Sequence, residues 1–396
     1  MPLANAQLNA LRSFILLYVL MYAAFGVASP FWPRFFETRG MIPEQIGLLL
    51  GLGTLVRLIA GPVAGRIADR WQQLRGVLAA TAALAACLAF GLLWVGGFWL
   101  FLIVRLCQEA ALAPTTSLAD ALALGASKSR AASGVRFEYG WVRGSASAAF
   151  VVGTIVAGQV IASSQLTSIA WMHAVLLLGA ATSAMLLPVP DHRTEAAHEP
   201  SSFRAIRELM GIVVFRRVVL IAALVFGSHA MHDAFAVIRW NAAGISPTTI
   251  SLLWSEAVVA EVIVFVLLGP RLVDAIGPGG AAAIACMAAI LRWIVMALST
   301  NPDMLAFVQP LHGLTFALLH LACMRLMGVA VPQHLAATGL AIYALGPGLV
   351  TALLTLSSGM LYARLGANGF LVMALLSALA LPLSLGLQLH FKRCSD

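Results

Sequence analysis

The sequence predicts an all-α polytopic membrane protein, with twelve transmembrane helices arranged as two six-helix halves. Composition is the first observation behind this fold class. Hydrophobic residues make up 61% of the 396 residues and charged residues only 10%, with a mean hydropathy of +0.94. A water-soluble domain carries about a quarter of its residues as charged side chains. The second observation is a series of about twelve long apolar runs, interrupted by one polar segment.

Such a chain needs lipid as its solvent, which excludes most soluble enzymes and nucleic-acid-binding proteins. We therefore interpret the formal net charge of +8 as a signal of membrane orientation, and we expect no nucleic-acid partner. The five cysteines are scattered and include no CxxC pair. We expect neither a disulfide framework nor a metal site from them.

Each apolar run is interpreted as one helix, because about 20 mainly apolar residues cross the hydrocarbon core and the helix pairs its own backbone polar groups there. The first run is too long for the core of a signal peptide, so it is taken as the first span. In chain order, the predicted spans are 11–35, 44–65, 76–97, 98–124, 136–162, 169–188, 216–240, 246–268, 279–298, 302–329, 335–362 and 367–390.

Most connections between these spans are short, but residues 189–215 are polar, contain prolines and are dense in charge. They divide the chain into an N-terminal six-helix half (1–190), a cytoplasmic central linker (191–215) and a C-terminal six-helix half (216–396). Within the spans, helix breaks are predicted at Pro30, Pro114, Pro310 and the run Gly346-Pro347-Gly348, since proline interrupts the helical hydrogen bonds.

The distribution of basic residues predicts the orientation. With the N-terminus in the cytoplasm, the opposite side keeps little beyond Arg34, Arg39, Arg239 and Arg364. The positive-inside rule then places both termini and the central linker in the cytoplasm. The basic residues assigned to the inside are Arg12, Arg66, Arg70, Arg75, Lys128, Arg130, Arg136, Arg193, Arg204, Arg207, Arg216, Arg217, Arg271, Lys392 and Arg393.

The loop between the second and third spans contains Gly65-Arg-Ile-Ala-Asp69-Arg70, with Arg75 following. It resembles the G-x-x-x-D-R loop of the major facilitator superfamily, and two six-span halves are the layout of that superfamily. We expect Gly65 to permit a close helix contact, and Asp69 to cap a helix or pair with an arginine. The equivalent loop of the second half, from Gly269 to Asp274, is a degenerate echo that also contains Arg271.

Ionisable residues inside the spans are costly in lipid, so each is a candidate functional residue. A channel with a passive pore needs few such groups, whereas a proton-coupled carrier needs several, because a carboxylate must change protonation as access to the pocket changes. The candidates are Arg57, Arg105, Glu109, Asp120, Arg143, His229, His232, Asp233, Glu256, Glu261, Arg292, His312 and His320.

In the first half, Arg105 and Glu109 are four residues apart on one helical face, so they either neutralise each other or belong to a pocket. Asp120 and Arg143 lie on neighbouring helices, where they either form a salt bridge or face a substrate. Arg143 is the better candidate ligand for a carboxylate, because a guanidinium binds carboxylates with two parallel hydrogen bonds.

In the second half, Glu261, Arg292 and His312 form a predicted proton relay, because Glu and His exchange protons readily. His320 suits an interhelical hydrogen bond about as well. His229 and His232 share a helical face, while we expect the adjacent Asp233 to point elsewhere. A His/Asp metal site at this place lacks a third ligand at suitable spacing.

Aromatic residues are a further candidate for the substrate cavity, although membrane helices also use them as interface anchors and in packing. These residues are Phe31, Trp32, Tyr139, Trp141, Trp240, Trp254 and Trp293.

Several stretches along the chain form a recognisable set. They are Pro30-Phe31-Trp32, Ile46 to Gly51 with Arg57, Phe137 to Arg143, Val259-Ala-Glu261-Val-Ile, Leu291-Arg292-Trp293, Leu311 to Phe316, and His320 to Arg325. Together they resemble the phenylpropionate permease family of the major facilitator superfamily over essentially the whole chain. The resemblance implies the major facilitator fold and secondary active transport.

The chain also resembles, more distantly, the lactose/proton symporters, which share the pattern Phe-Glu-(Tyr/Phe)-Gly-x-x-Arg ending here at Arg143. That resemblance implies a substrate-binding role for Arg143, with Asp120 near it, and coupling roles for Glu261, Arg292 and His312. The chain departs from the pattern at Thr315, where the lactose type has a glutamate. We therefore assign the proton-carrying role to Glu261. His232-Asp233 and Glu109 are not features that the resemblance implies.

The predicted function is proton-coupled uptake of a small aromatic carboxylate, such as a phenylpropionate, by alternating access. The predicted substrate-binding residues are Arg143, Asp120, Arg57, Arg105, Glu109, Trp32, Tyr139 and Trp254. The predicted proton-coupling residues are Glu261, His312, Arg292, Glu256 and Asp233, and the predicted gate motif consists of Gly65, Asp69 and Arg70.

Two alternatives keep the fold: a sugar or nucleoside/proton symporter, and a drug/proton antiporter. A polytopic membrane enzyme would need a nucleophile–base or metal motif, and the sequence contains neither a GxSxG elbow nor an HExxH motif. We expect a monomer in the inner membrane of a bacterial cell, with lipid, protons and a small molecule as partners. No cofactor is expected beyond the proton gradient as the energy source.

Overall fold

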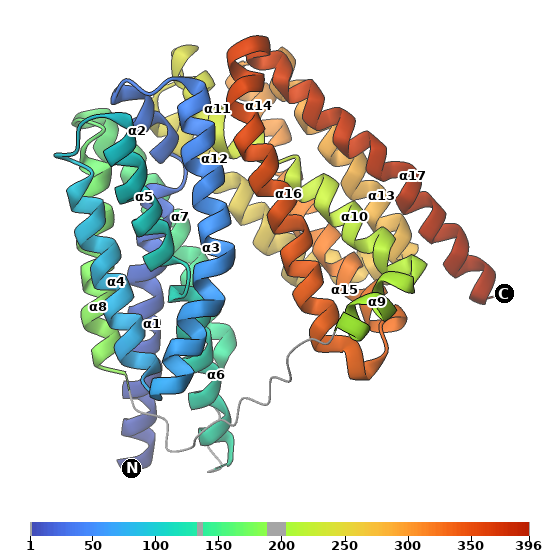
Figure 1. Cartoon of the computed structure of the whole chain (residues 1–396), viewed down its shortest axis with the longest axis horizontal. Coiled ribbons are helices and arrows are strands. Elements are labelled where there is room, and N and C mark those ends of the chain that lie inside the picture. The colour runs from blue at the N-terminus through green and yellow to red at the C-terminus, as the bar shows by residue number, and fades with distance from the viewer. Residues whose placement is uncertain (1, 133–137, 188–202, 396) are drawn as a thin grey trace. The chain divides into compact units, whose positions relative to one another are not determined.

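The computed structural model describes residues 2–132, 138–187 and 203–395, and the side chains of residues 10–127, 138–187 and 203–388 among them. All regular structure in these ranges is helical (Figure 1), which confirms the all-α class. Ten helical segments are long and apolar enough to cross a membrane.

Two of these segments, Pro247–Leu298 and Gln333–Gln388, contain 52 and 56 residues, which is more than twice the ~20 residues that one crossing needs. Each is interrupted by a glycine with a positive φ, +77° at Gly277 and +55° at Gly366, a conformation that glycine adopts without a steric penalty. Each segment therefore supplies two crossings, and the ten segments account for the twelve predicted spans.

The chain forms two compact units, each described here by itself. Unit 1 comprises Met1–Arg39 and Leu52–His198, and unit 2 comprises Gly40–Gly51 and Glu199–Asp396. The beginning of α3 (Pro43–Trp71) thus belongs to unit 2, where Gly47 packs against Gly359 of α16 (Ala336–Leu365). The predicted N-terminal half, 1–190, includes this stretch of α3.

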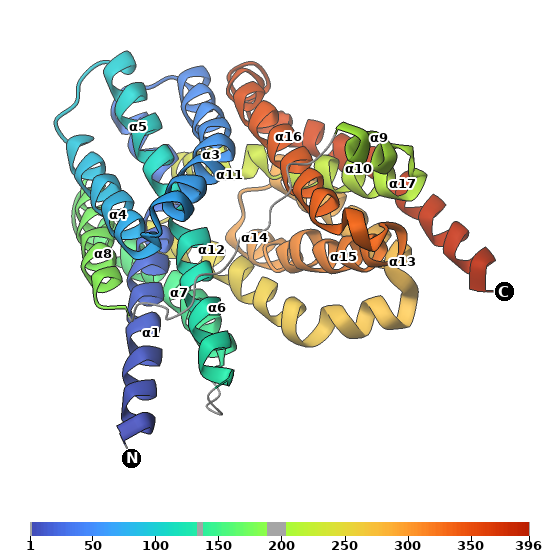
Figure 2. The ribbon, with the colours of Figure 1, turned by 60° about the horizontal axis from the view of Figure 1, so that its bottom comes forward.

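Unit 1 is a helical bundle in which α1 packs along α7 and α8, and α4 lies beside α8 (Figures 1 and 2). Its core includes Phe14, Leu17 and Met21 from α1, with Leu122 from α6 and Ala146 from α7. Besides the greater part of α3, its helices are α1 (Pro2–Ala28), α2 (Trp32–Thr38), α4 (Leu74–Gly91), α5 (Phe98–Leu112), α6 (Thr115–Ala132), α7 (Tyr139–Ser163) and α8 (Ser168–Met185).

In unit 2, α13 packs against α15 and α17, and α10 packs against α16 (Figure 2). Two of its segments are π-helical, η1 (Val264–Leu268) and η2 (Gly313–Leu318), and they contact each other. The remaining helices are α9 (Phe203–Gly211), α10 (Val213–Gly227), α11 (Ala230–Ala242), α12 (Pro247–Ile263), α13 (Gly269–Leu298), α14 (Pro302–Val308), α15 (Leu319–Ala330), η3 (Gln333–Leu335), α16, η4 (Gly366–Asn368) and α17 (Gly369–Ser395).

Three of the four predicted proline breaks are present. Pro30 lies between α1 and α2, Pro114 between α5 and α6, and Pro310 between α14 and η2. The prediction at Pro347 was wrong, because α16 continues through this residue. A proline removes one backbone donor, and a membrane helix packed among its neighbours tolerates that loss.

Part of the predicted linker is helical, since α9 lies within 191–215 and α10 begins at Val213. Several predictions fall outside the described residues or side chains: the N-terminal part of the linker, Phe137 of the arginine-ending motif, and the inside basic residues Lys128, Arg130, Arg136, Arg193, Lys392 and Arg393.

Candidate functional site

Asp120 is the centre of a polar cluster in unit 1, which we call the Asp120 cluster. Its Oδ1 accepts hydrogen bonds from the hydroxyls of Tyr18 on α1 (2.5 Å) and Tyr139 on α7 (2.7 Å). Arg143 of α7 lies 3.8 Å from the same oxygen through Nη1. The predicted salt bridge between Asp120 and Arg143 therefore exists, although it is longer than a hydrogen bond.

Arg143 is the exposed member of this cluster. Its Nη1 also donates to the hydroxyl of Tyr22, and its guanidinium lies over the Tyr22 ring, 5.2 Å from the centroid. Tyr22 in turn stacks on Tyr18. The Arg143 side chain is 48% exposed, and both polar contacts use only one of its three nitrogens. The structure thus holds this guanidinium in place without burying it, as a site that binds a carboxylate requires.

A second cluster of unit 1, the Glu109 cluster, contains two arginines around one carboxylate. Arg105 and Glu109 of α5 form an ion pair, and Arg57 of α3 lies 3.6 Å from Glu109 through Nη1. Arg105 also donates to Gln108 (2.5 Å). Arg105 and Glu109 are buried, whereas the Arg57 side chain is half exposed. Arg105 and Glu109 therefore neutralise each other, as one of the two predictions had it. With Arg57 included, the cluster carries one more positive charge than negative charge.

Trp32 of α2 packs against this cluster and is itself buried. The Arg105 guanidinium lies 5.2 Å from the Trp32 ring centroid, in the range of a cation–π interaction. His173 of α8 meets the same ring edge to face at 5.7 Å, and its Nδ1 lies 2.9 Å from the carbonyl oxygen of Ala24. Sequence reasoning missed Gln108, because a single neutral amide in an apolar run gives no signal of its partners. It also missed His173, although this ionisable residue lies within the predicted span 169–188 and was visible in the sequence.

Arg292 of α13 is the centre of the polar network in unit 2, and it is fully buried. Its Nη1 lies 3.1 Å from Nδ1 of His312, and its Nη2 lies 3.4 Å from Nε2 of His232. Nη2 also donates to Oε1 of Gln309 at 2.7 Å. Since a guanidinium can only donate hydrogen bonds, both imidazole nitrogens that face it must be acceptors.

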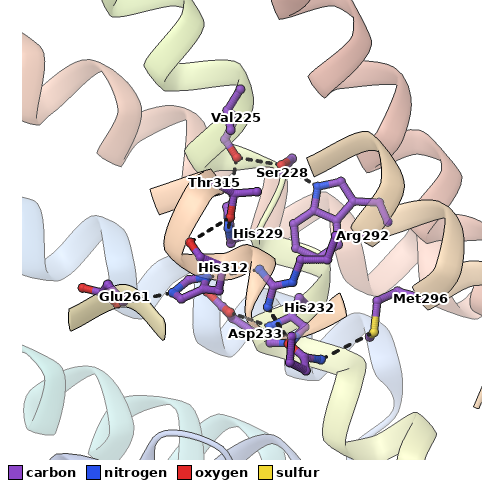
Figure 3. A network of polar contacts seen from close by, with 12 residues as sticks. Val225, Ser228, His229, His232, Asp233, Glu261, Arg292, Met296, His312 and Thr315 are labelled. Carbon is purple, nitrogen blue, oxygen red and sulfur yellow. Dashed lines mark hydrogen bonds and ion pairs between the residues drawn. The ribbon is translucent and has the colours of Figure 1, made fainter. Parts of the chain in front are cut away.

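Each of these two histidines meets a carboxylate with its other ring nitrogen. Nε2 of His312 lies 3.4 Å from Oε2 of Glu261, and Nδ1 of His232 lies 3.1 Å from Oδ1 of Asp233. Figure 3 shows the resulting chain, which runs from Glu261 through His312, Arg292 and His232 to Asp233. Because the inner nitrogens accept from Arg292, we assign the imidazole hydrogens to the outer nitrogens, where the carboxylates accept them.

The side chains of this contact network become more exposed toward its two ends, Glu261 and Asp233. The His312 and Glu261 side chains are 21% and 26% exposed. His232 is buried, but the Asp233 side chain is 61% exposed. The predicted relay of Glu261, Arg292 and His312 is therefore one contiguous set of contacts around a buried cation. Together with His232 and Asp233 it forms a network with two carboxylates, which lie at its more exposed ends.

The expectation that Asp233 points away from His232 was wrong. Neighbouring positions on a helix are turned by about 100° from each other, which ordinarily separates their side chains. Here the Nδ1 of His232, the ring nitrogen nearer the backbone, is within reach of the short Asp233 side chain. Gln309 was missed altogether, since a lone amide carries no sequence signal.

Other polar residues of unit 2 lie next to the Arg292 network or apart from it. Nε2 of His229 lies 3.0 Å from the hydroxyl of Thr315, the residue at which the chain departs from the lactose pattern. His320 forms an interhelical hydrogen bond with Tyr343 (3.3 Å). Glu256 makes no ion pair with another described residue and takes no part in the chain.

The two π-helical segments lie next to the acidic and the imidazole members of the chain. Glu261 precedes η1 in the last turn of α12, and His312 directly precedes η2. Gly313 allows η2 to pack closely against the end of α12, because a Cβ at Gly313 would lie 2.6 Å from the carbonyl oxygen of Ala260. Single π-helical turns occur often at functional sites.

Most of the candidate aromatic residues pack against other side chains. Trp240 and Trp293 are fully buried, and Trp254 stacks on His232 with ring centroids 4.8 Å apart. Trp293 donates to the hydroxyl of Ser228 at 2.8 Å. Trp141, by contrast, is 68% exposed, as an interface anchor would be.

The predicted gate motif of unit 1 does not make the contacts expected of it. A Cβ on Gly65 would meet open space among the described residues. The close helix contact that was expected at Gly65 is therefore not present among them. The N-cap of α4 is Gln73, without a side-chain cap, and Asp69 forms no ion pair with another described residue. The short loop between α3 and α4 leaves Asp69 exposed at the end of α3.

The echo of this motif in unit 2 does make such contacts. A Cβ on Gly269 would lie 2.4 Å from Leu321 of α15, and Asp274 pairs with Arg325 at 3.3 Å. Among the described residues, no group of three or more His, Cys, Asp or Glu side chains could hold a metal ion.

Comparison with known proteins places this geometry in a family. The family model described as "MFS_1 like family" matches residues 11–372. The chain belongs to the MFS_1 like family. It is therefore a secondary transporter of the major facilitator superfamily and a multi-pass membrane protein, which confirms the predicted family and fold.

Two relatives and one solved structure illustrate the match. The chain is 30% identical over 375 residues to the probable 3-phenylpropionic acid transporter of Escherichia coli (strain K12), covering 93% of this chain and 96% of that protein. It is 24% identical to the maltose permease of Geobacillus stearothermophilus, over 89% and 87% of the two chains. The crystal structure of the nucleoside transporter NupG superposes with a TM-score of 0.80 at 16% identity, over 97% and 99%.

Proposed function

We propose that this member of the MFS_1 like family couples the inward movement of protons to the uptake of a small aromatic carboxylate such as 3-phenylpropionate. It acts by alternating access, as a monomer in the inner membrane of a bacterial cell, with both termini in the cytoplasm. The proton gradient is its energy source and it needs no other cofactor. The excess of basic residues on one side of the predicted topology supports this orientation.

The single observation that carries the proton coupling is the contact chain of Glu261, His312 and Arg292. A carboxylate that is a quarter exposed meets an imidazole, and the imidazole meets a buried guanidinium. Protonation of Glu261 removes a negative charge that balances Arg292, so uptake of the proton changes the contacts among α12, α13 and His312, which directly precedes η2. That dependence is what a coupled carrier requires.

Arg143 supports an anionic cargo. Its guanidinium is held by Tyr22 and by the Asp120 cluster while it stays half exposed, so it can donate two parallel hydrogen bonds to a carboxylate. The printed name of the 30% identical relative, a probable 3-phenylpropionic acid transporter, supports a phenyl-bearing acid as that cargo.

A sugar/proton symporter is the second candidate. The Asp120 carboxylate, which the hydroxyls of Tyr18 and Tyr139 already approach at 2.5 and 2.7 Å, is an acceptor suited to further hydroxyls. The 24% identical maltose permease supports this cargo class.

The experiment that separates these cargoes is uptake of labelled 3-phenylpropionate into proteoliposomes. It is measured with the lumen alkaline or acidic relative to the medium, each with and without a protonophore. Accumulation only under an inward proton gradient, abolished by the protonophore, is expected. Absence of uptake in vesicles that contain folded protein would overturn the aromatic acid, and labelled maltose under the same gradients then tests the sugar.

A further inference from the structure

Arg292 contacts two histidines, each of which faces a carboxylate, and we call each histidine–carboxylate pair an arm. The proposed coupling uses only the first arm, His312 and Glu261. The second arm consists of His232 and Asp233 of α11, with contacts of 3.4 Å from Arg292 to His232 and 3.1 Å from His232 to Asp233. The two arms share one architecture: a guanidinium donates to an imidazole, and the imidazole faces a carboxylate (Figure 3). They leave Arg292 from different nitrogens, Nη1 and Nη2.

The charges of the two arms do not balance. Both imidazoles accept a hydrogen bond from Arg292 and therefore keep a ring nitrogen unprotonated, so they are neutral in this geometry. With Glu261 and Asp233 both ionised, one guanidinium faces two carboxylates and the network carries one excess negative charge. One proton on either carboxylate makes it neutral, and a neutral network is far less costly inside a membrane.

The Asp233 arm is built to keep its imidazole in place. The His232 ring is stacked on Trp254, 4.8 Å between centroids, and lies 5.9 Å from the Trp293 ring. Its carboxylate partner lies in the first turn of α11, where the positive end of the helix dipole favours an anion. At 61% exposure the Asp233 side chain is also the most accessible member of the whole network, so it can exchange protons with water.

The ionisable groups whose charges act on Asp233 are His229, His312 and Arg292. Two of them belong to the network, and the third, His229, is the N-cap of α11 and contacts Thr315. Helices α12, α16 and α17 pack against α11, and their ionisable groups among the described side chains are Glu256, Glu261, Tyr343, Tyr362 and Arg364. Helix α13 also contacts α11, through Arg292 and through the carbonyl oxygens of Met296 and Ala297, to which Arg239 donates.

We propose that Asp233 is a second proton acceptor of the coupling network, linked through His232 to Arg292, and that Asp233 and Glu261 alternate as the carboxylate that balances this cation. A hydronium ion transfers its proton to the Asp233 carboxylate, forming an O–H bond, and leaves as water. That O–H bond breaks when the proton is released to a water molecule. No proton passes through Arg292; the arms are linked by its charge. The inference rests on the proposed proton coupling.

The test compares two transport modes in proteoliposomes for Asp233→Asn, Glu261→Gln, Asp233→Glu and the control Asp303→Asn, an exposed carboxylate at the start of α14. The modes are accumulation of labelled 3-phenylpropionate under an inward proton gradient, and exchange of labelled for unlabelled substrate without a gradient. Asp233→Asn is expected to lower accumulation at least tenfold and to leave exchange within about twofold of the parent. Asp233→Glu, which keeps a carboxylate, is expected to retain accumulation.

The outcomes separate the two proposals. If Glu261→Gln loses accumulation while Asp233→Asn keeps it, the Asp233 arm is overturned and the proposed coupling stands. If both variants accumulate substrate like the parent, the proposed coupling itself fails. If Asp233→Asn loses exchange as well and Asp233→Glu does not restore it, Asp233 is a structural or substrate-binding residue and the second arm is again overturned.

A substrate-independent measurement keeps the inference testable if 3-phenylpropionate is not the cargo. Infrared difference spectra between high and low pH report the C=O stretch of protonated carboxyl groups in purified protein reconstituted in lipid. The band removed by Asp233→Asn is expected to shift its pH midpoint by about one unit in Glu261→Gln, since the two groups share one counter-charge. An unchanged midpoint in that variant, as in Asp303→Asn, would overturn the link between the arms.

Discussion

The two units hold their intramembrane charges in different ways. In unit 1 the guanidinium groups contact carboxylates directly, as in Arg105 with Glu109 and Arg143 with Asp120. In unit 2, Arg292 contacts no carboxylate directly among the described side chains, and it reaches two of them through histidines. A direct pair fixes both charges, whereas an imidazole bridge lets a carboxylate gain a proton while the cation keeps its neutral hydrogen-bond partners. On the proposed function, the direct pairs of unit 1 therefore serve substrate binding, and the bridged pairs of unit 2 serve proton exchange.

Removing the half-exposed guanidinium of the Asp120 cluster has the largest expected effect on transport. Arg143→Ala is expected to lower uptake of labelled 3-phenylpropionate by more than a hundredfold, because the bidentate contact with the carboxylate is lost. The variant is expected to stay folded in the membrane, since Arg143 is half exposed. Uptake assays and gel filtration of the purified protein check both statements, and normal uptake would remove Arg143 from the binding site.

The next change acts on the proton side. Glu261→Gln is expected to abolish accumulation driven by a pH gradient, while substrate exchange without a gradient continues at a rate within about threefold of the parent. The amide can still accept from His312 but it cannot take up a proton. Accumulation that persists in this variant would move the proton site to another carboxylate.

A stability measurement sharpens the contrast between direct and bridged pairs. Glu109→Gln leaves the buried Arg105 without its anion, and we expect a loss of about 3 kcal/mol of stability. Glu261→Gln is expected to cost less, because Arg292 keeps its neutral partners His312, His232 and Gln309. Thermal unfolding of the two detergent-purified variants, followed by intrinsic fluorescence, gives the order, and equal midpoints would contradict it.

The smallest expected effect concerns the two equivalent loops. Asp274→Asn breaks an exposed pair with Arg325, in which both side chains are about two-thirds exposed, so we expect a loss below about 1 kcal/mol. Asp69→Asn breaks no ion pair with another described residue, and we expect no change in the unfolding midpoint. A larger shift for Asp69→Asn than for Asp274→Asn would show that the first loop has a structural partner.

Composition and the length of the apolar runs were sufficient to predict the all-α membrane class, because lipid permits few alternatives to membrane-spanning helices. The major facilitator fold itself was predicted from the central linker, the loop motif and the family resemblance. The charged members of the network were also predictable, since an ionisable residue in an apolar span is visible in the sequence itself. Glu261, Arg292 and His312 were found in this way.

Neutral partners and local contacts were not predictable. Gln309 and Gln108 carry no charge signal, and Tyr18 lies 102 residues from the Asp120 that it contacts. The contact between His232 and Asp233 depends on side-chain rotamers rather than on helical spacing, and Gly65 showed that a motif predicts a loop more reliably than the contacts of that loop.

On the proposed function, the network of unit 2 couples the movement of protons to the transport of substrate. The most direct test follows the pH inside proteoliposomes with a trapped dye after 3-phenylpropionate is added outside, with no initial gradient, and subtracts the signal of protein-free vesicles because the free acid permeates lipid. Acidification of the lumen by the parent protein is expected, as is its loss in Glu261→Gln while exchange of labelled substrate continues. Transport by the parent without any excess acidification, or equal acidification by Glu261→Gln, would contradict it.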